Sequence, residues 1–283
     1  MSGRLPFILD AQKLRRIVSF NATSRLAGAA ADTCLPAPFL KAVITAYAKA
    51  FRVNMEESMR SVEEFSSMGD FFTRELKPGL RPIASGEKLL TSPADGTIHN
   101  FGPIREGCIP QVKGQDYSVA NLLQDEEMAQ RFSGGTYSTI YLSPKDYHRV
   151  HSPAAGKVVS CRYIPGALYS VSPIVVNNLA NVFTTNERIP IYLDTPHGLI
   201  AIVMVGATIV GRVRLSFCDL TTNRANASEE ARTFDPPLNV TKGAELGAFQ
   251  LGSTVVLLMQ GNWEPHGLAE EMPIRMGMPI FSR

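Results

Sequence analysis

From about residue 81 onward, short apolar or β-branched runs alternate with turns rich in proline and glycine. The 283 residues include 19 prolines and 22 glycines, which interrupt long helices and favour short antiparallel strands. Apolar residues make up 45% of the chain and charged residues 19%, which is enough apolar material for an ordinary buried core. The runs that we expect to form strands are 96–104, 136–142, 156–164, 199–206, 207–217 and 254–260.

Two stretches have the period of a helix instead. Residues 119–132 (VANLLQDEEMAQRF) follow Ser118, a suitable N-cap, and end before Gly134-Gly135. Residues 39–52 (FLKAVITAYAKAFR) place their large apolar side chains within one arc of about 140° and their cations opposite. The sequence therefore predicts an α+β fold, with a mainly antiparallel, barrel- or sandwich-like β core and N-terminal amphipathic helices.

The charge of the chain is uneven. Residues 1–60 contain nine Lys or Arg and four Asp or Glu, a net +5, although the whole chain carries only +2. A basic, amphipathic segment indicates contact with an anionic membrane surface. An equally good interpretation is that these helices only cover the main domain. Nucleic acid is not an expected partner, because no basic-aromatic cluster or recognised nucleic-acid motif is present.

Other features point to the cytoplasmic side of a membrane. The four cysteines are widely spaced and form no C-x-x-C pair, so we expect neither a disulfide framework nor a zinc site. The longest apolar run, residues 199–211, is too short for a transmembrane helix, and charges interrupt the N-terminus where a signal peptide would be apolar. We expect a peripheral protein on the cytoplasmic face of the inner membrane.

One short sequence occurs twice. Residues 92–98 (SPADGTI) and 152–158 (SPAAGKV) are identical at four of seven positions, and each leads from a proline turn into an expected strand. We therefore consider a two-fold internal repeat. Asp95 stands where the second copy has Ala155, and the turn itself needs no carboxylate there, so Asp95 is a candidate functional residue.

Two further positions have chemical potential. His148 and His151 lie three residues apart beside aromatic and cationic residues, and histidine moves protons near neutral pH. No third ligand is close in sequence, although His99 is conceivable, and we expect no metal. Ser253 follows Gly252 at the start of an apolar run.

Asp95, His151 and Ser253 permit two kinds of chemistry. The trio could form a Ser-His-Asp hydrolase in a single chain. Alternatively, the Ser253 hydroxyl could attack the carbonyl of Gly252, which has no Cβ to obstruct it. His151 would take the hydroxyl proton and Asp95 would orient the imidazole. A third possibility is a lipid-binding β module without catalysis, whose proline turns are purely structural.

Six stretches in order resemble one family, the bacterial-type phosphatidylserine decarboxylases. They span roughly residues 47 to 261. The stretches are 68–77 (MGDFFTRELK) with Arg81-Pro82, 92–98, 142–156 (LSPKDYHRVHSPAAG), 176–189 (VNNLANVFTTNERI), 205–211 (VGATIVG) and 247–255 (GAFQLGSTV).

The resemblance implies self-cleavage at Gly252–Ser253 by a triad of Asp95, His151 and Ser253. The products would be a β chain, 1–252, and an α chain, 253–283, that begins with a pyruvoyl group derived from Ser253. This covalent cofactor would form a Schiff base with phosphatidylserine and release CO₂ to give phosphatidylethanolamine, with His148 contributing to decarboxylation. The resemblance further implies that the two chains stay together and that two such pairs form a homodimer. We expect a membrane-association segment over residues 1–60 and a catalytic domain over 61–283.

Overall fold

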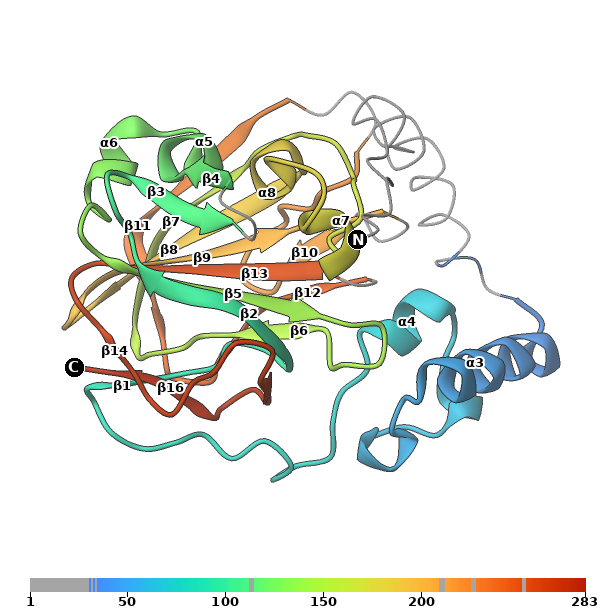
Figure 1. Cartoon of the computed structure of the whole chain (residues 1–283). Helices are drawn as coiled ribbons and strands as arrows, with labels where there is room; N and C mark the ends of the chain where they lie inside the picture. The colour runs from blue at the N-terminus through green and yellow to red at the C-terminus, as the bar shows by residue number, and fades with distance from the viewer. Residues whose placement is uncertain are drawn as a thin grey trace, which may run out of the picture.

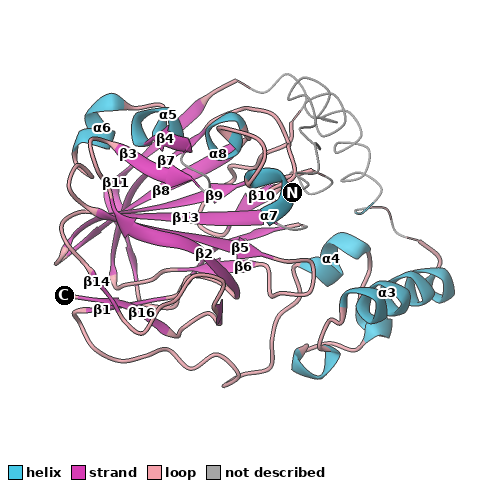
Figure 2. Cartoon of the chain, in the orientation of Figure 1, coloured by secondary structure: helices cyan, strands magenta, loops and turns pink. Residues whose placement is uncertain are grey.

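The computed structural model describes residues 31, 33, 35–111, 115–208, 212–224, 228–250 and 253–283. Residues 1–30 of the expected membrane-association segment 1–60 therefore lie outside the described residues. Strands dominate the described chain, with short helices around them (Figure 2). The α+β class and the antiparallel pairing are confirmed.

Eight strands form the central antiparallel sheet, in the order β11-β7-β8-β9-β13-β5-β2-β15. Their bounds are β2 Gly96–Pro103, β5 Thr136–Leu142, β7 Gly156–Tyr163, β8 Arg188–Thr195, β9 Gly198–Val205, β11 Glu230–Val240, β13 Ser253–Met259 and β15 Pro273–Ile274.

Three smaller sheets accompany it. One has the order β1-β16-β14, a second the order β10-β12-β6, and β3 pairs with β4. Their bounds are β1 Leu89–Thr91, β3 Cys108–Gln111, β4 Gln115–Ser118, β6 Arg149–His151, β10 Val213–Leu215, β12 Glu245–Phe249, β14 Glu264–Pro265 and β16 Pro279–Ser282. The described strands form open sheets. The predicted barrel-like shape is therefore wrong for this part of the chain, since no closed barrel forms in it.

The expected repeat has a structural counterpart. The two turns that carry it are built alike: Ser92 Oγ donates to the Ala94 carbonyl at 2.6 Å, and Ser152 Oγ donates to the Ala154 carbonyl at 2.7 Å. The strands leading into the turns, β1 and β6, also occupy matching edges of the two three-stranded sheets. The central sheet has the same correspondence. From one side toward its middle the strands are β2, β5 and β13, and from the other side they are β7, β8 and β9.

The core has two layers, one on each face of the central sheet. Side chains of β9 alternate between them: Ile200, Ile202 and Met204 pack on one face, and Ala201 and Val203 pack on the other. The first face is covered by the two three-stranded sheets and the second by short helices, as Figure 1 shows. Because both faces are buried, β9 and β13 appear in the sequence as continuous apolar runs.

The short helices depart in one place from expectation. They are α5 Val119–Leu123, α6 Glu126–Gln130, α7 Pro173–Val176 and α8 Val182–Thr185. Ser118 caps α5 as predicted, but the expected helix 119–132 breaks at Gln124, which has a left-handed φ of 48°. Asp125 then caps α6 by accepting a hydrogen bond from the Met128 N–H at 2.9 Å. Of the described residues in the expected strand 207–217, only those of β10 form a strand.

The N-terminal helices form a separate group at one side of the sheets (Figure 1). They are α3 Ala37–Phe51, the 3₁₀ turns η1 Met55–Glu57 and η2 Val62–Glu64, and α4 Met68–Phe72. Helix α3 confirms the expected amphipathic helix, and it buries Leu40, Ile44 and Ala48 while Phe39 and Phe51 stay exposed. The apolar cluster of this group runs from Leu40 to Phe72, across the predicted boundary at residue 60.

Candidate active site

Ser253 opens the central strand β13 and pairs with Leu142 of β5. Its hydroxyl is fully buried and has no hydrogen-bond partner among the described residues. Gly252, the other half of the predicted cleavage site, lies outside those residues. A buried polar atom without a partner is uncommon, because the missing hydrogen bond costs about 1–3 kcal/mol. The described part of the fold therefore makes no use of the Ser253 hydroxyl.

His148 lies in the loop that connects β5 to β6, and its side chain is fully buried. Its Nδ1 lies 2.8 Å from the Asp146 carbonyl oxygen, which can only accept, so Nδ1 carries the proton. Nε2 is consequently an unprotonated acceptor, and it too is buried without a partner in the described structure. Burial lowers the pKa of His148 to about 4, so the ring is neutral near pH 7.

His151 ends β6 and has both ring nitrogens engaged. Nδ1 donates to the Gly243 carbonyl at 2.8 Å, which leaves Nε2 to accept from the Tyr147 hydroxyl at 3.0 Å. Burial lowers the pKa of His151 as well. Tyr147 is thus a site residue that the sequence reasoning missed, although it directly precedes His148.

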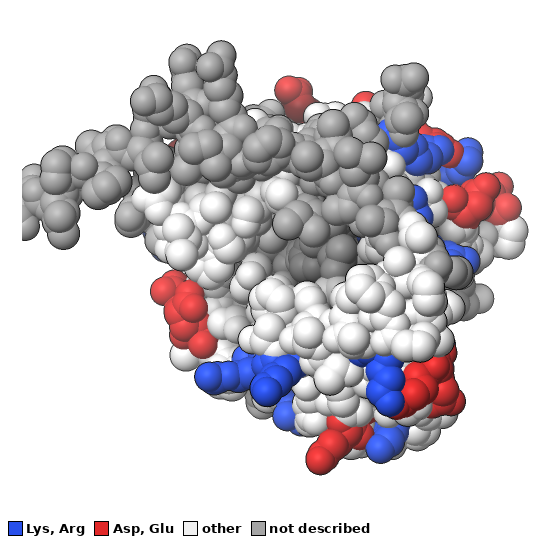
Figure 3. All heavy atoms as spheres, turned by 90° about the vertical axis from the view of Figure 1, so that its right-hand side faces the viewer, with Lys and Arg blue, Asp and Glu red and all other residues white. Residues whose placement is uncertain are grey.

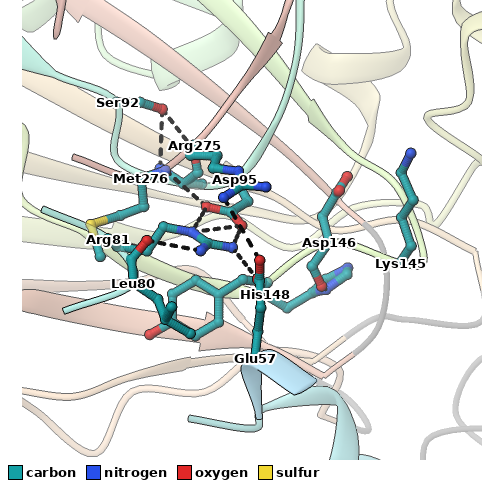
Figure 4. Close-up of polar contacts among 12 residues, drawn as sticks. Glu57, Leu80, Arg81, Ser92, Asp95, Lys145, Asp146, His148, Arg275 and Met276 are labelled. Carbon is teal, nitrogen blue, oxygen red and sulfur yellow. Dashed lines mark hydrogen bonds and ion pairs between the residues drawn. The ribbon is translucent and has the colours of Figure 1, made fainter. Parts of the chain in front are cut away.

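Asp95 is held by a different partner from the one predicted. Arg81 donates to both of its carboxylate oxygens, from Nε at 2.9 and 3.0 Å and from Nη2 at 2.5 Å. The Met276 N–H adds a fourth hydrogen bond at 2.8 Å. Arg81 also donates to Glu57 at 2.6 Å, so one guanidinium joins two carboxylates (Figure 4).

The structure brings the predicted residues into one region without joining them by side-chain hydrogen bonds. The backbone N–H of His151 donates to the Pro93 carbonyl at 2.7 Å, in the turn that carries Asp95. The N–H of Phe249, four residues before Ser253, donates to the His148 carbonyl at 2.9 Å. Asp95, however, bonds Arg81 and His151 bonds Tyr147. Arg81 lies within a family-like stretch, which was the only signal for it in the sequence.

A cavity of about 410 Å³ has Asp95, Arg81 and Tyr147 in its wall, whereas the two histidines and Ser253 do not line it. Five cations and three acids contribute to its wall, so its lining has an excess of positive charge. The charged residues are Arg52, Arg74, Arg81, Lys145, Arg275, Glu57, Asp95 and Asp146. Figure 3 shows the face of the molecule that carries α3 and α4, where basic side chains gather along the lower edge with acidic ones beside them.

The remaining cysteines and histidines supply no further centre in the described part of the chain. Cys108, Cys161 and Cys218 are free thiols. His99 lies 3.7 Å from a Glu271 carboxylate oxygen, and burial lowers its pKa. No group of three or more His, Cys, Asp or Glu side chains in that part could hold a metal ion. None of the described helices has both the length and the apolar character needed to cross a membrane.

Comparison with known proteins decides the family. The family described as phosphatidylserine decarboxylase matches residues 68–282 of this chain. The chain belongs to the phosphatidylserine decarboxylase family. The resemblance inferred from the six stretches is therefore confirmed.

Three bacterial relatives of this family member show how far the similarity extends. All three are named phosphatidylserine decarboxylase proenzyme. The protein of Myxococcus xanthus is 42% identical over 271 residues, which cover 95% of this chain and 96% of the relative. That of Anaeromyxobacter sp. is 42% identical over 271 residues, covering 94% and 95%. That of Pseudomonas aeruginosa is 41% identical over 264 residues, covering 90% of each.

Proposed function

We propose that this chain is the proenzyme of a phosphatidylserine decarboxylase. It cleaves itself between Gly252 and Ser253 and turns Ser253 into a pyruvoyl group, its covalent cofactor. The mature enzyme converts phosphatidylserine to phosphatidylethanolamine and CO₂. The observation that supports this most is the buried, unpartnered hydroxyl of Ser253 at the first position of β13. It stands in a family whose relatives are named proenzymes.

Self-cleavage needs one proton acceptor and no external reagent except water. The Ser253 hydroxyl attacks the Gly252 carbonyl carbon, the C–O bond forms, and the peptide C–N bond breaks to give an ester and a free amine. Loss of the Cα proton then breaks the Cβ–Oγ bond and releases a carboxylate on Gly252. Hydrolysis of the remaining enamine, through its imine form, releases ammonia.

We assign the acceptor role to His151 and the orienting role to Asp95. In the described state, His151 must exchange the hydroxyl of Tyr147 for that of Ser253, because its Nδ1 already donates to Gly243. Asp95 must likewise reach the imidazole while Arg81 holds its carboxylate. The proposal therefore includes a small side-chain rearrangement around Tyr147 before cleavage.

A pyruvoyl group at position 253 fits its surroundings, because its formation removes a buried hydroxyl that has no partner among the described residues and leaves an apolar methyl group at Cβ. When present, the group supplies a ketone that takes up the substrate amine and accepts the electron pair left by CO₂. His148 is our candidate for returning a proton to the substrate Cα. Because its neutral ring offers a free Nε2, His148 first collects the proton that it later delivers.

We further propose that the enzyme acts as a peripheral protein at the cytoplasmic face of the membrane. Residues 1–60 form the membrane-association segment and 61–283 the catalytic domain, with the cleaved chains held together and paired as a homodimer. Helix α3 supports membrane contact through its exposed apolar side chains Phe39 and Phe51. Replacing both with Asn in the full chain should lower co-sedimentation with anionic liposomes, and unchanged sedimentation would refute contact through α3.

Intact mass under denaturing conditions tests the proposed reaction. Active protein should consist of chains 1–252 and 253–283, the shorter one bearing a blocked, carbonyl-reactive end. Ser253→Ala should remain a single chain without activity, and His151→Ala and Asp95→Ala should also remain uncleaved. His148→Ala should be cleaved at least in part and yet release no CO₂ from phosphatidylserine.

Ser138 provides the matched control. It is another buried serine of the central sheet whose hydroxyl has no partner among the described residues. Ser138→Ala should be cleaved normally, because only Ser253 adjoins the scissile bond. Decarboxylation by a protein that remains a single chain would refute the proposal and favour a single-chain mechanism. Ester hydrolysis without CO₂ release would instead support the Ser-His-Asp hydrolase.

A further inference from the structure

Arg74 is a buried cation with unused hydrogen-bond donors. It follows α4 and is only 3% exposed. Nη2 donates to the carbonyls of Lys145 and Asp146, at 3.0 and 3.2 Å. Nε and Nη1 are buried and have no partner among the described residues. Arginine is rarely buried unless its charge is paired, so this arrangement leaves a partner missing.

The neighbouring acids do not supply that partner. Burial lowers the pKa of Arg74. The charges of Asp95, Asp146 and Glu57 raise it, but they act without a hydrogen bond to Arg74. Asp95 and Glu57 are hydrogen-bonded to Arg81. Asp146 accepts from the backbone N–H and the hydroxyl of Ser143, both at 2.7 Å. Among the described residues no acid pairs with these donors of Arg74, which are therefore available to an anion from outside that part of the chain.

The cavity beside Arg74 suits such an anion. Arg74 forms part of its wall together with Lys145, Arg52 and Arg275. Cations outnumber acids in this wall, and the acids are already bonded to other groups. The Nη1 group of a guanidinium donates a charge-assisted hydrogen bond to an oxygen of a phosphate or carboxylate.

The same cavity lies next to the residues assigned to catalysis. The loop carbonyls that bind Arg74 belong to Lys145 and Asp146, just before His148. The charge of Arg74 also acts on the His148 ring. Thr97 lines the cavity and pairs with Tyr141, whose neighbour Leu142 pairs with Ser253. Two strand spacings, about 10 Å, thus separate the cavity wall from the strand of Ser253.

We propose that this cavity binds the phosphodiester of the substrate headgroup and that Arg74 donates to one of its oxygens from Nη1. The inference rests on the proposed function and adds the subsite that holds the headgroup. In a phosphoserine headgroup four bonds, about 5 Å, separate the amine from the phosphorus. The headgroup therefore spans about half of the roughly 10 Å between the cavity wall and the strand of Ser253.

The phosphate is a better occupant than the carboxylate of the same headgroup. Decarboxylation moves negative charge away from the carboxylate, so an arginine bound there would stabilise the substrate more than the transition state. An arginine on the phosphate binds both states equally. Loss of this contact should therefore raise KM and leave kcat nearly unchanged.

The test compares Arg74→Gln with the wild type in the full chain. The control is Lys77→Gln, which removes one positive charge from an exposed residue outside the cavity wall. Calorimetry measures binding of glycerophosphoethanolamine, a phosphodiester without carboxylate or acyl chains, and of serine, a carboxylate without phosphate. Kinetics use short-chain phosphatidylserine in mixed micelles, and intact mass reports self-cleavage.

Arg74→Gln should be cleaved as the wild type is and bind glycerophosphoethanolamine at least about tenfold more weakly. KM should rise by a similar factor with kcat within about threefold, and Lys77→Gln should match the wild type. Equal phosphodiester binding by wild type and Arg74→Gln would overturn the proposal. Serine binding that depends on Arg74, without phosphodiester binding, would assign the site to the carboxylate and overturn it as well.

A second variant and a binding measurement on the uncut chain decide the question if the first comparison fails. If Arg74→Gln does not fold, Arg74→Lys retains the charge but has a single nitrogen, which cannot replace both Nη2 on the loop carbonyls and Nη1 on the phosphate. It should therefore still bind the phosphodiester more weakly. Equal affinity of Arg74→Lys would then overturn the proposal. If the wild type neither cleaves itself nor releases CO₂, the proposed function fails, while binding of glycerophosphoethanolamine by the uncut chain still decides the subsite.

Discussion

The buried His148 ring predicts a specific dependence of stability on pH. Its pKa falls from 6.5 to about 4 on folding, because burial disfavours the charged ring. Between these values the unfolded chain binds a proton that the folded chain does not, so stability falls as pH falls. The slope is about 1.4 kcal/mol per pH unit, or roughly 3 kcal/mol over the whole interval. Above pH 7 this group contributes no pH dependence.

The measurement isolates His148 by difference. Urea unfolding of Ser253→Ala and of Ser253→Ala/His148→Gln, both checked by mass to be single chains, gives the free energy of unfolding from pH 8 to pH 4.5. Between pH 7.5 and 4.5, the protein with His148 should lose roughly 2–3 kcal/mol more than the protein without it. Above pH 7.5 the difference between them should be constant, which serves as the internal control. Parallel curves over the whole range would refute the buried neutral ring.

Two further predictions concern the turn that carries Asp95. Arg81→Met should destabilise the chain by about 3–5 kcal/mol, because the side chains of Arg81 and Asp95 are only 7% and 8% exposed and the carboxylate would lose its partner. Arg81→Met/Asp95→Asn should recover part of this loss in urea unfolding, and additive effects would contradict a direct pair. Gly96→Ala should lower the melting temperature and slow self-cleavage, because a Cβ there would lie 2.4 Å from the Tyr141 carbonyl oxygen. A variant that melts and cleaves like the wild type would contradict this close contact.

Much of the β core follows from local pattern. The apolar runs that end at turns predicted β2, β5, β7 and β13 within one or two residues. Two long strands of the central sheet, β8 and β11, were missed because their sequences conceal the pattern. Strand β8 contains Pro190, and the edge strand β11 is mostly exposed, with Pro236-Pro237 at its register shift. An edge strand tolerates proline because its outer N–H groups have no strand to bond.

The expected 119–132 helix shows the limit of such patterns in another way. The apolar spacing continues through Gln124, but the backbone turns left-handed there and a new cap at Asp125 starts a second helix. The spacing indicated which side chains would be buried, and it could not distinguish one helix from two short ones.

The sequence by itself determined the family, the residue types of the candidate site and the class of fold, because these depend on order and local spacing. Only the tertiary structure decided the partners of those residues. Asp95 bonds Arg81, His151 bonds Tyr147 and a carbonyl 92 positions away, and Arg74 reaches a loop more than 70 positions away. The physical reason is that a buried donor bonds whichever acceptor the packing places beside it, and packing joins segments that are distant in sequence.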